Sequence, residues 1–512
     1  MMDTLIELNL YGRDYEQELR PLIRAFLPHS EFEVNHYEAE EEPMRELCRE
    51  EPTFLLAANP AYEYTFSCIL MNDWYRIRVY RSGVCVGRAD ADAVDPERKA
   101  YRNSVAREIY RVLALETGTE LPWGILTGVR PTKLVYEALE AGEDAAQIES
   151  WLREEYLVSE EKIATSLQVA RREREILTGM NYRDGYSIYI GIPFCPTTCH
   201  YCSFTSYPLE RFGKLTDAYL DALTKEIEYL GTCMPGRKLQ TVYIGGGTPT
   251  ALSAEQLERL LTAVWQYLPM ENCIEFTVEA GRPDSITERK LRILTEQGVT
   301  RISINPQTMQ QRTLDLIGRR HTVQQIIDAM HMARELGHDN INMDIIIGLT
   351  GENPDDVRGT LAEIAKLDPD SLTVHTLARK RAARLTTQRE DYEGMEAQGV
   401  TEMLAESIRF CREHNYLPYY LYRQKNMAEN LENVGYAKHG REGIYNILIM
   451  EEKQTILAAG AGAMSKFVFY DEDRIERVEN VKSLTDYIDR IDEMIGRKQA
   501  FLAANELPGG NE

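Results

Sequence analysis

Three cysteines occur in one short segment of the sequence, Cys195-Pro-Thr-Thr-Cys199-His-Tyr-Cys202, with the spacing C-x3-C-x2-C. They follow an apolar, strand-like stretch at residues 187–192. Three thiolates on so short a loop can bind three irons of a 4Fe–4S cluster, because cysteine thiolates are the usual ligands of such clusters. The fourth iron would have no protein ligand nearby, and an iron with an open position can bind a small molecule and transfer an electron to it. The segment therefore predicts a redox site.

Two other readings of the cysteine segment stay open. A structural zinc ion usually takes four ligands, often from paired C-x2-C units. His200 could complete a Cys3His set, but it lies between two of the cysteines and would have to fold back. The cysteines could also be unrelated to any metal. A disulfide is disfavoured, because the chain has the features of a cytosolic protein.

Composition limits the classes of protein to consider. The chain has 512 residues, which predicts two or three domains, and 43% of them are hydrophobic, enough to form cores. No apolar run approaches the ~20 residues that a membrane span requires, and the N-terminus lacks the features of a secretory signal. Nine cysteines in such a chain indicate reduced thiols and a cytoplasmic location. The net charge of −24 favours solubility and disfavours nucleic-acid binding, which requires a basic face.

The middle of the chain repeats one pattern, in which a short β-rich segment ends in a polar or glycine-containing loop and a helical pattern follows. In one such helix, apolar residues recur at helical spacing from Val323 to Leu336, and Gly337 stands where a C-terminal cap belongs. Six strand–helix units predict an α/β fold with a parallel sheet that curls towards a barrel. The predicted strands cover residues 187–190, 241–244, 274–278, 300–304, 341–347 and 371–376.

Glycines and polar residues follow these strands, at the carboxyl ends where such folds collect their chemistry. In Gly245-Gly-Gly-Thr-Pro-Thr250 the three glycines let backbone groups approach a ligand closely. This segment is neither a P-loop nor the dinucleotide fingerprint, and a structural turn is the alternative. A second glycine group, Gly460-Ala-Gly-Ala-Met-Ser465, is expected to pack beneath the site. The other strand ends carry Glu279, Asn305-Pro-Gln307, Asp344, and Ala378 with the basic run Arg379-Lys380-Arg381.

Several motifs together carry a family resemblance. They are Tyr189-Ile-Gly-Ile-Pro-Phe-Cys195, the cysteine spacing, the Gly-Gly-Gly-Thr-Pro-Thr segment, Arg301-Ile-Ser-Ile and Asp344-Ile-Ile-Ile-Gly-Leu. In combination they resemble the radical S-adenosylmethionine (SAM) enzymes of the oxygen-independent coproporphyrinogen III dehydrogenase family. Longer strings, such as Trp123-Gly-Ile-Leu-Thr-Gly-Val-Arg-Pro-Thr-Lys133, resemble a long subgroup with an extra N-terminal domain.

The resemblance implies two cofactors. Cys195, Cys199 and Cys202 would ligate a 4Fe–4S cluster, and SAM would complete the coordination of the fourth iron through its amino and carboxylate groups. Tyr189 and Tyr201 would line the adenosyl and cluster environment.

The resemblance also implies contacts to SAM at the other strand ends. Carboxylates accept hydrogen bonds from hydroxyl groups and arginine pairs with a carboxylate, so the implied roles are chemically reasonable. Taken alone, the acidic residues could instead be strand-end caps and the arginine a surface charge. The implied contacts are Gly246, Gly247 and Thr248 for the methionine end, Glu279 for the ribose or amino group, Gln307 and Arg319 for polar ends, Asp344 for the ribose hydroxyls and Ala378 for the adenine.

The reaction implied by the resemblance is an oxidative decarboxylation. A 5′-deoxyadenosyl radical derived from SAM removes a hydrogen atom from a propionate of coproporphyrinogen III, and loss of carbon dioxide and one electron leaves a vinyl group. Two rounds give protoporphyrinogen IX, with reduced flavodoxin or ferredoxin as the implied electron donor. The tetrapyrrole substrate carries four carboxylates, so its pocket needs cations. The candidates are Arg379, Lys380, Arg381 and Arg384, although these could simply form a solvated basic helix start.

Two departures from the family pattern bear on the substrate. The dehydrogenase has a cysteine where this chain has Phe204, and a histidine where this chain has Gly191. The alternative function is a haem-binding trafficking protein that retains the cluster and the SAM site. The nearest match to the His-Asn-x-x-Tyr-Trp motif of that branch, Glu429-Asn-Leu-Glu-Asn-Val-Gly-Tyr436, lacks the His and the Trp.

The predicted architecture is an α/β chain with a partial (β/α)6 radical SAM barrel at residues 183–385. An N-terminal α+β domain of unknown role covers residues 1–182, with strands at 4–10 and 75–80 and a helix at 99–115. A mainly helical region at residues 386–512 is expected to cover the substrate, with the tyrosine-rich stretch 416–422 over the barrel mouth.

Overall fold

The computed structural model describes residues 4–28, 30–50, 59–128, 130–202, 204–378, 397–423 and 431–507. The chain divides into two compact units between Leu167 and Gln168. This division lies inside helix α6 (Glu160–Gly179), whereas the sequence places a domain boundary after that helix, at residue 182. The expected boundary at residue 385 lies outside the described residues.

The first unit contains a five-stranded sheet in the order β2-β1-β3-β4-β5. Strand β1 is parallel to β2 and β3, and β4 and β5 continue the sheet antiparallel. Ile6, Leu8 and Leu10 alternate along β1 and are buried, as the two-residue period of a strand requires. The elements predicted at residues 4–10, 75–80 and 99–115 are confirmed by β1, β4 and α3. The elements are β1 (Thr4–Gly12), α1 (Glu16–Phe26), β2 (Ser30–Tyr37), α2 (Glu41–Glu50), β3 (Tyr64–Leu70), β4 (Tyr75–Arg81), β5 (Val84–Ala91), α3 (Arg98–Thr117), α4 (Thr132–Glu140) and α5 (Ala145–Tyr156).

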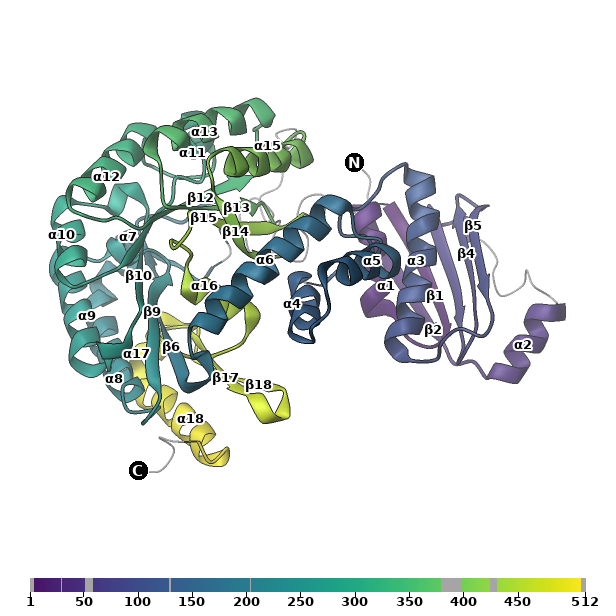
Figure 1. Ribbon diagram of the computed structural model, residues 1–512, viewed down its shortest axis with the longest axis horizontal. Coiled ribbons are helices and arrows are strands. Elements are labelled where there is room, and N and C mark those ends of the chain that lie inside the picture. Colours follow the sequence, from purple (N-terminus) through teal and green to yellow (C-terminus); the bar gives the residue numbers. More distant parts are fainter. Residues whose placement is uncertain are drawn as a thin grey trace. The chain divides into compact units, whose positions relative to one another are not determined.

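The second unit contains an eleven-stranded sheet in the order β14-β15-β13-β12-β11-β10-β9-β6-β16-β17-β18. The six parallel strands from β6 to β13 confirm the predicted partial barrel, and β16 adds a seventh parallel strand beside β6. The sheet is open, with β14 and β18 at its edges. The helices that connect the parallel strands form an outer arc (Figure 1). The strands are β6 (Gly185–Ile192), β9 (Lys238–Gly246), β10 (Glu275–Gly281), β11 (Arg301–Ile304), β12 (Ile341–Ile347) and β13 (Ser371–Thr376). The helices are α8 (Thr216–Leu230), α9 (Ala254–Tyr267), α10 (Glu288–Glu296), α11 (Gln311–Leu316), α12 (Val323–Glu335) and α13 (Pro354–Leu367).

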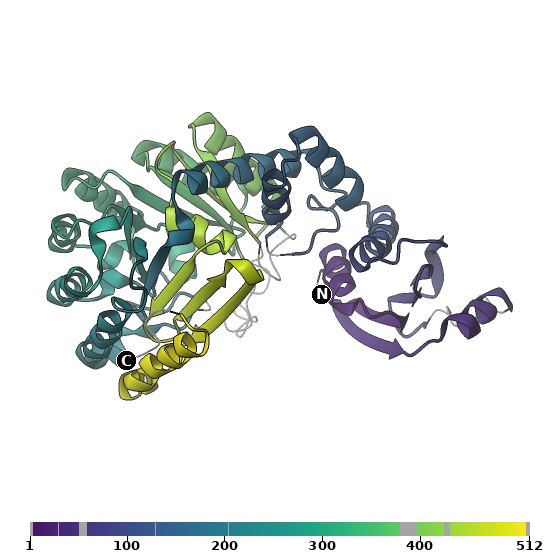
Figure 2. The same ribbon diagram turned by 60° about the horizontal axis from the view of Figure 1, so that its bottom comes forward.

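The described part of residues 386–512 contains the expected helices, but it also contains strands that the sequence analysis does not predict. The described part of this region contributes five strands to the sheet, two beside β13 and three beside β6. Figure 2 shows the C-terminal strands beside the barrel, followed by the final helix. Strands β15 and β16 are buried at every position, so they lack the alternation of polar and apolar residues from which a strand is recognised. The elements are α15 (Val400–Glu413), β14 (Leu417–Tyr422), β15 (Asn433–Ala437), α16 (Ile444–Glu451), β16 (Thr455–Ala459), β17 (Met464–Phe469), β18 (Arg474–Glu479), α17 (Leu484–Asp489) and α18 (Ile491–Ala504).

A buried polar network joins the C-terminal helices to the barrel. The carboxylate of Glu226 on α8 accepts hydrogen bonds from Lys498 Nζ at 2.6 Å and Tyr487 OH at 2.5 Å. It also accepts from Asn480 Nδ2 at 2.8 Å and from the Gly460 N–H at 2.9 Å. The side chains of Lys498 and Glu226 are almost completely buried, so each charge depends on the other for compensation. Gly460 also lies against the Gly191 carbonyl, which places the second glycine group directly behind the end of β6.

No helix in the described part of the chain combines the length and the apolar character that crossing a bilayer requires.

Replacing Lys498 with Met should lower the free energy of unfolding of the second unit by ~3–5 kcal/mol, because it leaves the Glu226 carboxylate buried without its cation. Urea denaturation followed by circular dichroism measures this change. Lys366→Met is the matched control, because Lys366 is exposed and its ion pair with Glu363 lies at the surface; it should change stability by less than about 0.5 kcal/mol. Equal effects of the two substitutions would contradict the role assigned to the buried pair.

Candidate functional site

The parallel strands of the second unit carry polar residues on the concave face of the sheet and apolar residues on the outer face. Along β6, Ile188 and Ile190 are fully buried, whereas Tyr189 between them is only partly buried. The same holds for Tyr243 on β9, Glu279 on β10, Asp344 on β12 and His375 on β13: each is a partly exposed residue in a strand that is otherwise largely buried. A row of accessible side chains across neighbouring strands indicates a recess at the carboxyl half of the sheet.

The cysteine segment lies at the carboxyl end of β6, at the edge of this recess. Cys195 belongs to the short strand β7 (Phe194–Cys195), and Cys199 is more deeply buried than Cys195 and Cys202. Burial raises the pKa of Cys195 to about 11, partly offset by a hydrogen bond with Thr248, and the nearby thiols of Cys199 and Cys202 raise it further. The three thiols therefore lie close enough to interact, and iron binding must displace their protons.

The surroundings of His200 do not favour the zinc alternative. Its ring Nδ1 lies 3.1 Å from the carbonyl oxygen of Leu316, and its backbone N–H donates to the carbonyl of Ile317 at 2.9 Å. Its ring also packs against Gly318, where a Cβ would lie 2.7 Å from Nε2. Across the described ranges, no three His, Cys, Asp or Glu side chains are arranged to hold a single metal ion. His200 instead anchors the cysteine segment to the end of α11.

The glycine segment packs directly against the cysteine segment. A Cβ on Gly247 would lie 2.6 Å from the Phe194 carbonyl oxygen and 3.0 Å from Cys195 Sγ, so no side chain fits at this position. Gly246 has a φ of 108°, a conformation that L-residues rarely adopt. The N–H groups of Gly247 and Thr248 donate to the carbonyls of Ile192 and Phe194, each at 2.7 Å. These contacts hold the two segments together at one corner of the recess.

Tyrosine rings and one acid form the wall next to this corner. Tyr189, Tyr243 and Tyr445 are stacked, with ring centroids 4.5 Å apart for Tyr243 and Tyr445 and 6.2 Å apart for Tyr189 and Tyr243. Tyr445 comes from α16, which lies inside the arc of strands (Figure 1). The Tyr243 hydroxyl donates to Glu279 at 2.5 Å. Withdrawal from water raises the pKa of Glu279 to about 7, and the nearby Asp344 adds to the rise, while hydrogen bonds from Tyr243 and Gly246 oppose it.

Asp344 on β12 stays ionised. Burial alone would raise its pKa, but the hydrogen bonds and charge of His375, together with hydrogen bonds from Asn342 and Thr373, hold the pKa below its ordinary value. Asn342 Nδ2 donates to Asp344 at 2.7 Å. The recess therefore contains one ionised carboxylate and one carboxyl that titrates near neutral pH.

Gln307 has the features of a ligand-binding residue. Its φ of 67° is unusual for a residue with a side chain, and two backbone hydrogen bonds to β12, from its N–H to Asp344 and from the Ile346 N–H to its carbonyl, hold it there. Its buried Oε1 has no hydrogen-bond partner in the described structure, and the same is true of Asn305 Oδ1 and Arg319 Nε. Buried polar atoms are normally paired, so these three atoms fit a polar ligand that supplies the missing partners.

Arg319 and Tyr201 close the recess beside Cys199. Arg319 is 5% exposed and donates from Nη1 to the Asn305 carbonyl at 2.5 Å. Burial raises the pKa of Tyr201 well above its ordinary value, and its ring packs on the apolar cluster of Ile317, Ile346 and Leu349. Ala378 follows β13 and is partly buried. The structure thus brings together the residues that the sequence analysis selects for the cluster and SAM. The basic candidates Arg379, Lys380, Arg381 and Arg384 lie outside the described residues.

Three residues of the site were missed by the sequence analysis: Tyr243, His375 and Tyr445. A signal existed for Tyr243 and His375, since both lie in predicted strands, at residues 241–244 and 371–376, and alternate positions of a strand share a face. Tyr445 reaches the site from α16, whose N-terminus docks on Glu275: this carboxylate accepts from the N–H groups of Ile444 and Tyr445 at 2.7 and 3.0 Å. No local pattern encodes that contact.

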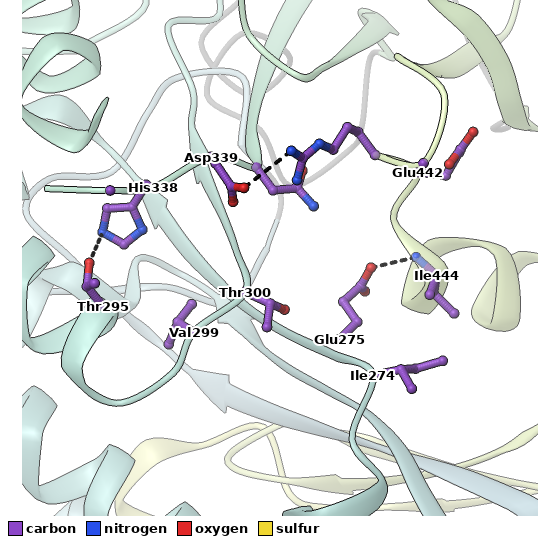
Figure 3. Close-up of a pocket in the computed structure, with 13 residues that line it drawn as sticks. Ile274, Glu275, Thr295, Val299, Thr300, His338, Asp339, Glu442 and Ile444 are labelled. Carbon is purple, nitrogen blue, oxygen red and sulfur yellow. Dashed lines mark hydrogen bonds and ion pairs between the residues drawn. The ribbon is translucent and has the colours of Figure 1, made fainter. Parts of the chain in front are cut away.

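A second recess lies at the opposite, amino end of the same strands (Figure 3). This cavity has a volume of about 310 Å³ and is lined by Glu275, Thr300, His338 and Arg441 among others. Its polar side chains bind one another or the backbone: His338 Nε2 lies 3.1 Å from Thr295 Oγ1, and Arg441 lies 3.3 Å from Asp339. These contacts indicate a structural role for the amino end.

Replacing Glu279 with Gln should stabilise the protein in a pH-dependent way. The folded-state pKa of about 7 lies above the ordinary value of 4.5, so ionisation of Glu279 costs stability; the cost is absent below pH 4.5 and complete above pH 7. At about 1.4 kcal/mol per pKa unit, discounted for partial exposure, the gain above pH 7 is about 2 kcal/mol. Urea denaturation of both proteins at pH 5 and pH 8 measures it. A gain that does not grow with pH would contradict the raised pKa.

Comparison with known proteins places this site in a family. The model of the Radical SAM superfamily matches residues 189–364. The oxygen-independent coproporphyrinogen-III oxidase-like protein HemZ of Bacillus subtilis is 42% identical over 408 residues, which are 79% of this chain and 81% of HemZ. The heme chaperone HemW of Bacillus subtilis is 38% identical over 192 residues, 37% of this chain and 50% of HemW.

One solved structure supports the fold. Coproporphyrinogen III oxidase (HemN) from Escherichia coli, described as a radical SAM enzyme, matches with a TM-score of 0.51 at 24% identity, over 63% of this chain and 73% of HemN. The cofactors of the superfamily are a 4Fe–4S cluster and SAM. The chain belongs to the radical SAM superfamily, in the family of oxygen-independent coproporphyrinogen III oxidases and oxidase-like proteins.

Proposed function

We propose that this protein catalyses the oxidative decarboxylation of coproporphyrinogen III propionates to vinyl groups, giving protoporphyrinogen IX. The observation that carries the proposal is the convergence, at one edge of the sheet, of the cysteine segment, the glycine segment and the inward row Tyr189, Glu279 and Asp344. The relation to HemZ, which covers most of both chains, supports the same class of reaction.

In this proposal Cys195, Cys199 and Cys202 hold the cluster at its edge of the recess. When bound, the cluster and SAM supply the one-electron chemistry that starts hydrogen abstraction. Because the glycines have no side chains, the backbone of the glycine segment can closely approach the methionine part of SAM, which would lie here. The proposed SAM contacts are Tyr189, Tyr201, Gly246, Gly247, Thr248, Glu279, Gln307, Arg319, Asp344 and Ala378.

The acidic wall would orient SAM by charge and hydrogen bonding. Asp344 is ionised and can accept hydrogen bonds from two ribose hydroxyls. Glu279 gains a cationic or hydroxyl partner when SAM binds, which would favour its ionised form. The stacked tyrosines exclude water from the same wall, because their rings fill the space between β6, β9 and α16. Water exclusion protects a reactive radical from side reactions.

Haem binding without turnover is the second candidate, and the similarity to the heme chaperone HemW favours it. Two positions bear on the choice. Gly191 stands where the oxidase pattern has a histidine, and a Cβ there would lie 3.4 Å from the Tyr189 ring. Phe204 stands where the pattern has a cysteine, and 69% of its surface is exposed. If this chain is an oxidase, another of its residues has to perform whatever role the histidine or the cysteine has at these two positions.

Anaerobic turnover decides between the two functions. The reconstituted protein is incubated with coproporphyrinogen III and SAM, with either dithionite or a reduced flavodoxin or ferredoxin, the proposed electron donors. Vinyl-containing products together with 5′-deoxyadenosine are expected. Stoichiometric haem binding with no vinyl product from either reductant would overturn the oxidase proposal and support the haem-binding one.

Replacing Cys199 with Ser should remove the cluster and abolish SAM cleavage, because a fully bound cubane needs all three thiolates. Iron and sulfide content per chain and 5′-deoxyadenosine formation measure the two effects. Cys85→Ser is the matched control, since Cys85 is an exposed thiol in the first unit. Full iron content in the Cys199 variant would refute the assignment of this ligand.

A further inference from the structure

An arginine that the function above does not use lies against the proposed cluster ligand Cys199. Arg282 follows β10 directly and is 3% exposed. Its Nη1 donates to the Thr197 carbonyl at 3.0 Å, to Thr197 Oγ1 at 2.8 Å and to Cys199 Sγ at 3.7 Å. One guanidinium nitrogen therefore binds the middle of the cysteine segment at three points.

The other side of the same guanidinium is held by a carboxylate. Arg282 Nε and Nη2 donate to Asp284 at 3.0 and 2.6 Å, so the pair is bidentate. Burial would raise the pKa of Asp284, but the hydrogen bonds and charge of Arg282 keep it below its ordinary value, and Asp284 is ionised. The ion pair is thus a buried dipole whose positive end faces Cys199 and whose negative end faces away.

Two neighbours define the local charge around this dipole. Arg319 also lies beside Cys199, which gives the thiol a second buried cation. His321 is fully buried between Asp284 and the two arginines, and burial lowers its pKa to about 3, with the arginine charges adding to the effect. The histidine is therefore neutral and adds no charge of its own to the field.

A positive field at this position acts on the redox state of a cluster. A cluster bound by three thiolates gains one negative charge on reduction, so a fixed positive end beside one of its sulfurs favours the reduced form. Groups around the ligands, in addition to the ligands themselves, set the potential of metal centres.

We propose that Arg282, oriented by Asp284, is a positioning residue that fixes the cysteine segment and raises the reduction potential of the cluster. The proposal rests on the ligand assignment of the proposed function. Arg282 and Asp284 are expected to have opposite effects on the potential. Removing the positive charge of Arg282 makes the field at Cys199 less positive, whereas removing the negative charge of Asp284 makes it more positive.

The test is a potentiometric titration of the reconstituted protein without SAM, monitored by the electron paramagnetic resonance signal of the reduced cluster. Arg282→Gln should lower the midpoint potential by about 59 mV, which for one electron corresponds to about a tenfold lower ratio of reduced to oxidised cluster at a given potential. Asp284→Asn should raise it, and Arg282→Lys, which keeps the charge, should stay closer to the native value than Arg282→Gln.

Arg289→Gln is the matched control, because Arg289 is an exposed arginine on α10 that pairs with Glu255. It should leave the potential unchanged. Shifts of the same sign for Arg282→Gln and Asp284→Asn at full iron content, or no shift in either, would overturn the proposal. If Arg282→Gln assembles no cluster, the sign of the Asp284→Asn shift alone decides. Failure of the ligand assignment is separate, since it appears as full iron content in Cys199→Ser.

Discussion

The alternation of side chains along six parallel strands is the constraint on which the site depends. The outward positions are apolar and pack on helices, and the inward positions carry hydroxyl, carboxyl and imidazole groups. Because the strands are in register, Tyr189 lies beside Tyr243 and Asp344 lies beside Thr373. A slip of one residue would exchange the two faces, so the pairing that buries the core is the same pairing that lines the recess.

Charge within the second unit is separated in a way that suits two different cofactors. The acids Glu279 and Asp344 lie on the strands, where a ligand with amino and hydroxyl groups would contact them. The buried cations Arg282 and Arg319 lie beside Cys199, where an iron–sulfur cluster would place negative charge. The acids thus lie where a ligand would have amino and hydroxyl groups, and the arginines lie where a cluster would be negatively charged. The net charge of −24 gives no indication of this local arrangement.

Much of this arrangement could be predicted from the sequence, for physical reasons that differ by residue. The strands at residues 341–347 and 371–376 are found within their observed bounds because each is a short β-rich run closed by a loop. The cysteine spacing and the glycine segment are local patterns and are equally visible. Arg282 and Tyr445 are not, because their roles arise from contacts with distant segments. Strands β15 and β16 were missed for a different reason, since a short segment buried at every position fits a buried helix or a buried strand equally well.

The strand that leads into the cysteine segment has a neighbour from the far end of the chain. Ser187 on β6 donates to Gln454, just before β16, across a separation of 267 positions. At ~5–20 residues per second, a ribosome needs roughly 13–50 s to synthesise that interval. During this time β6, an almost wholly apolar segment, has one unpaired edge of the kind that promotes association between chains. Folding of the nascent protein therefore includes a long interval in which this edge of β6 lacks its native partner, β16.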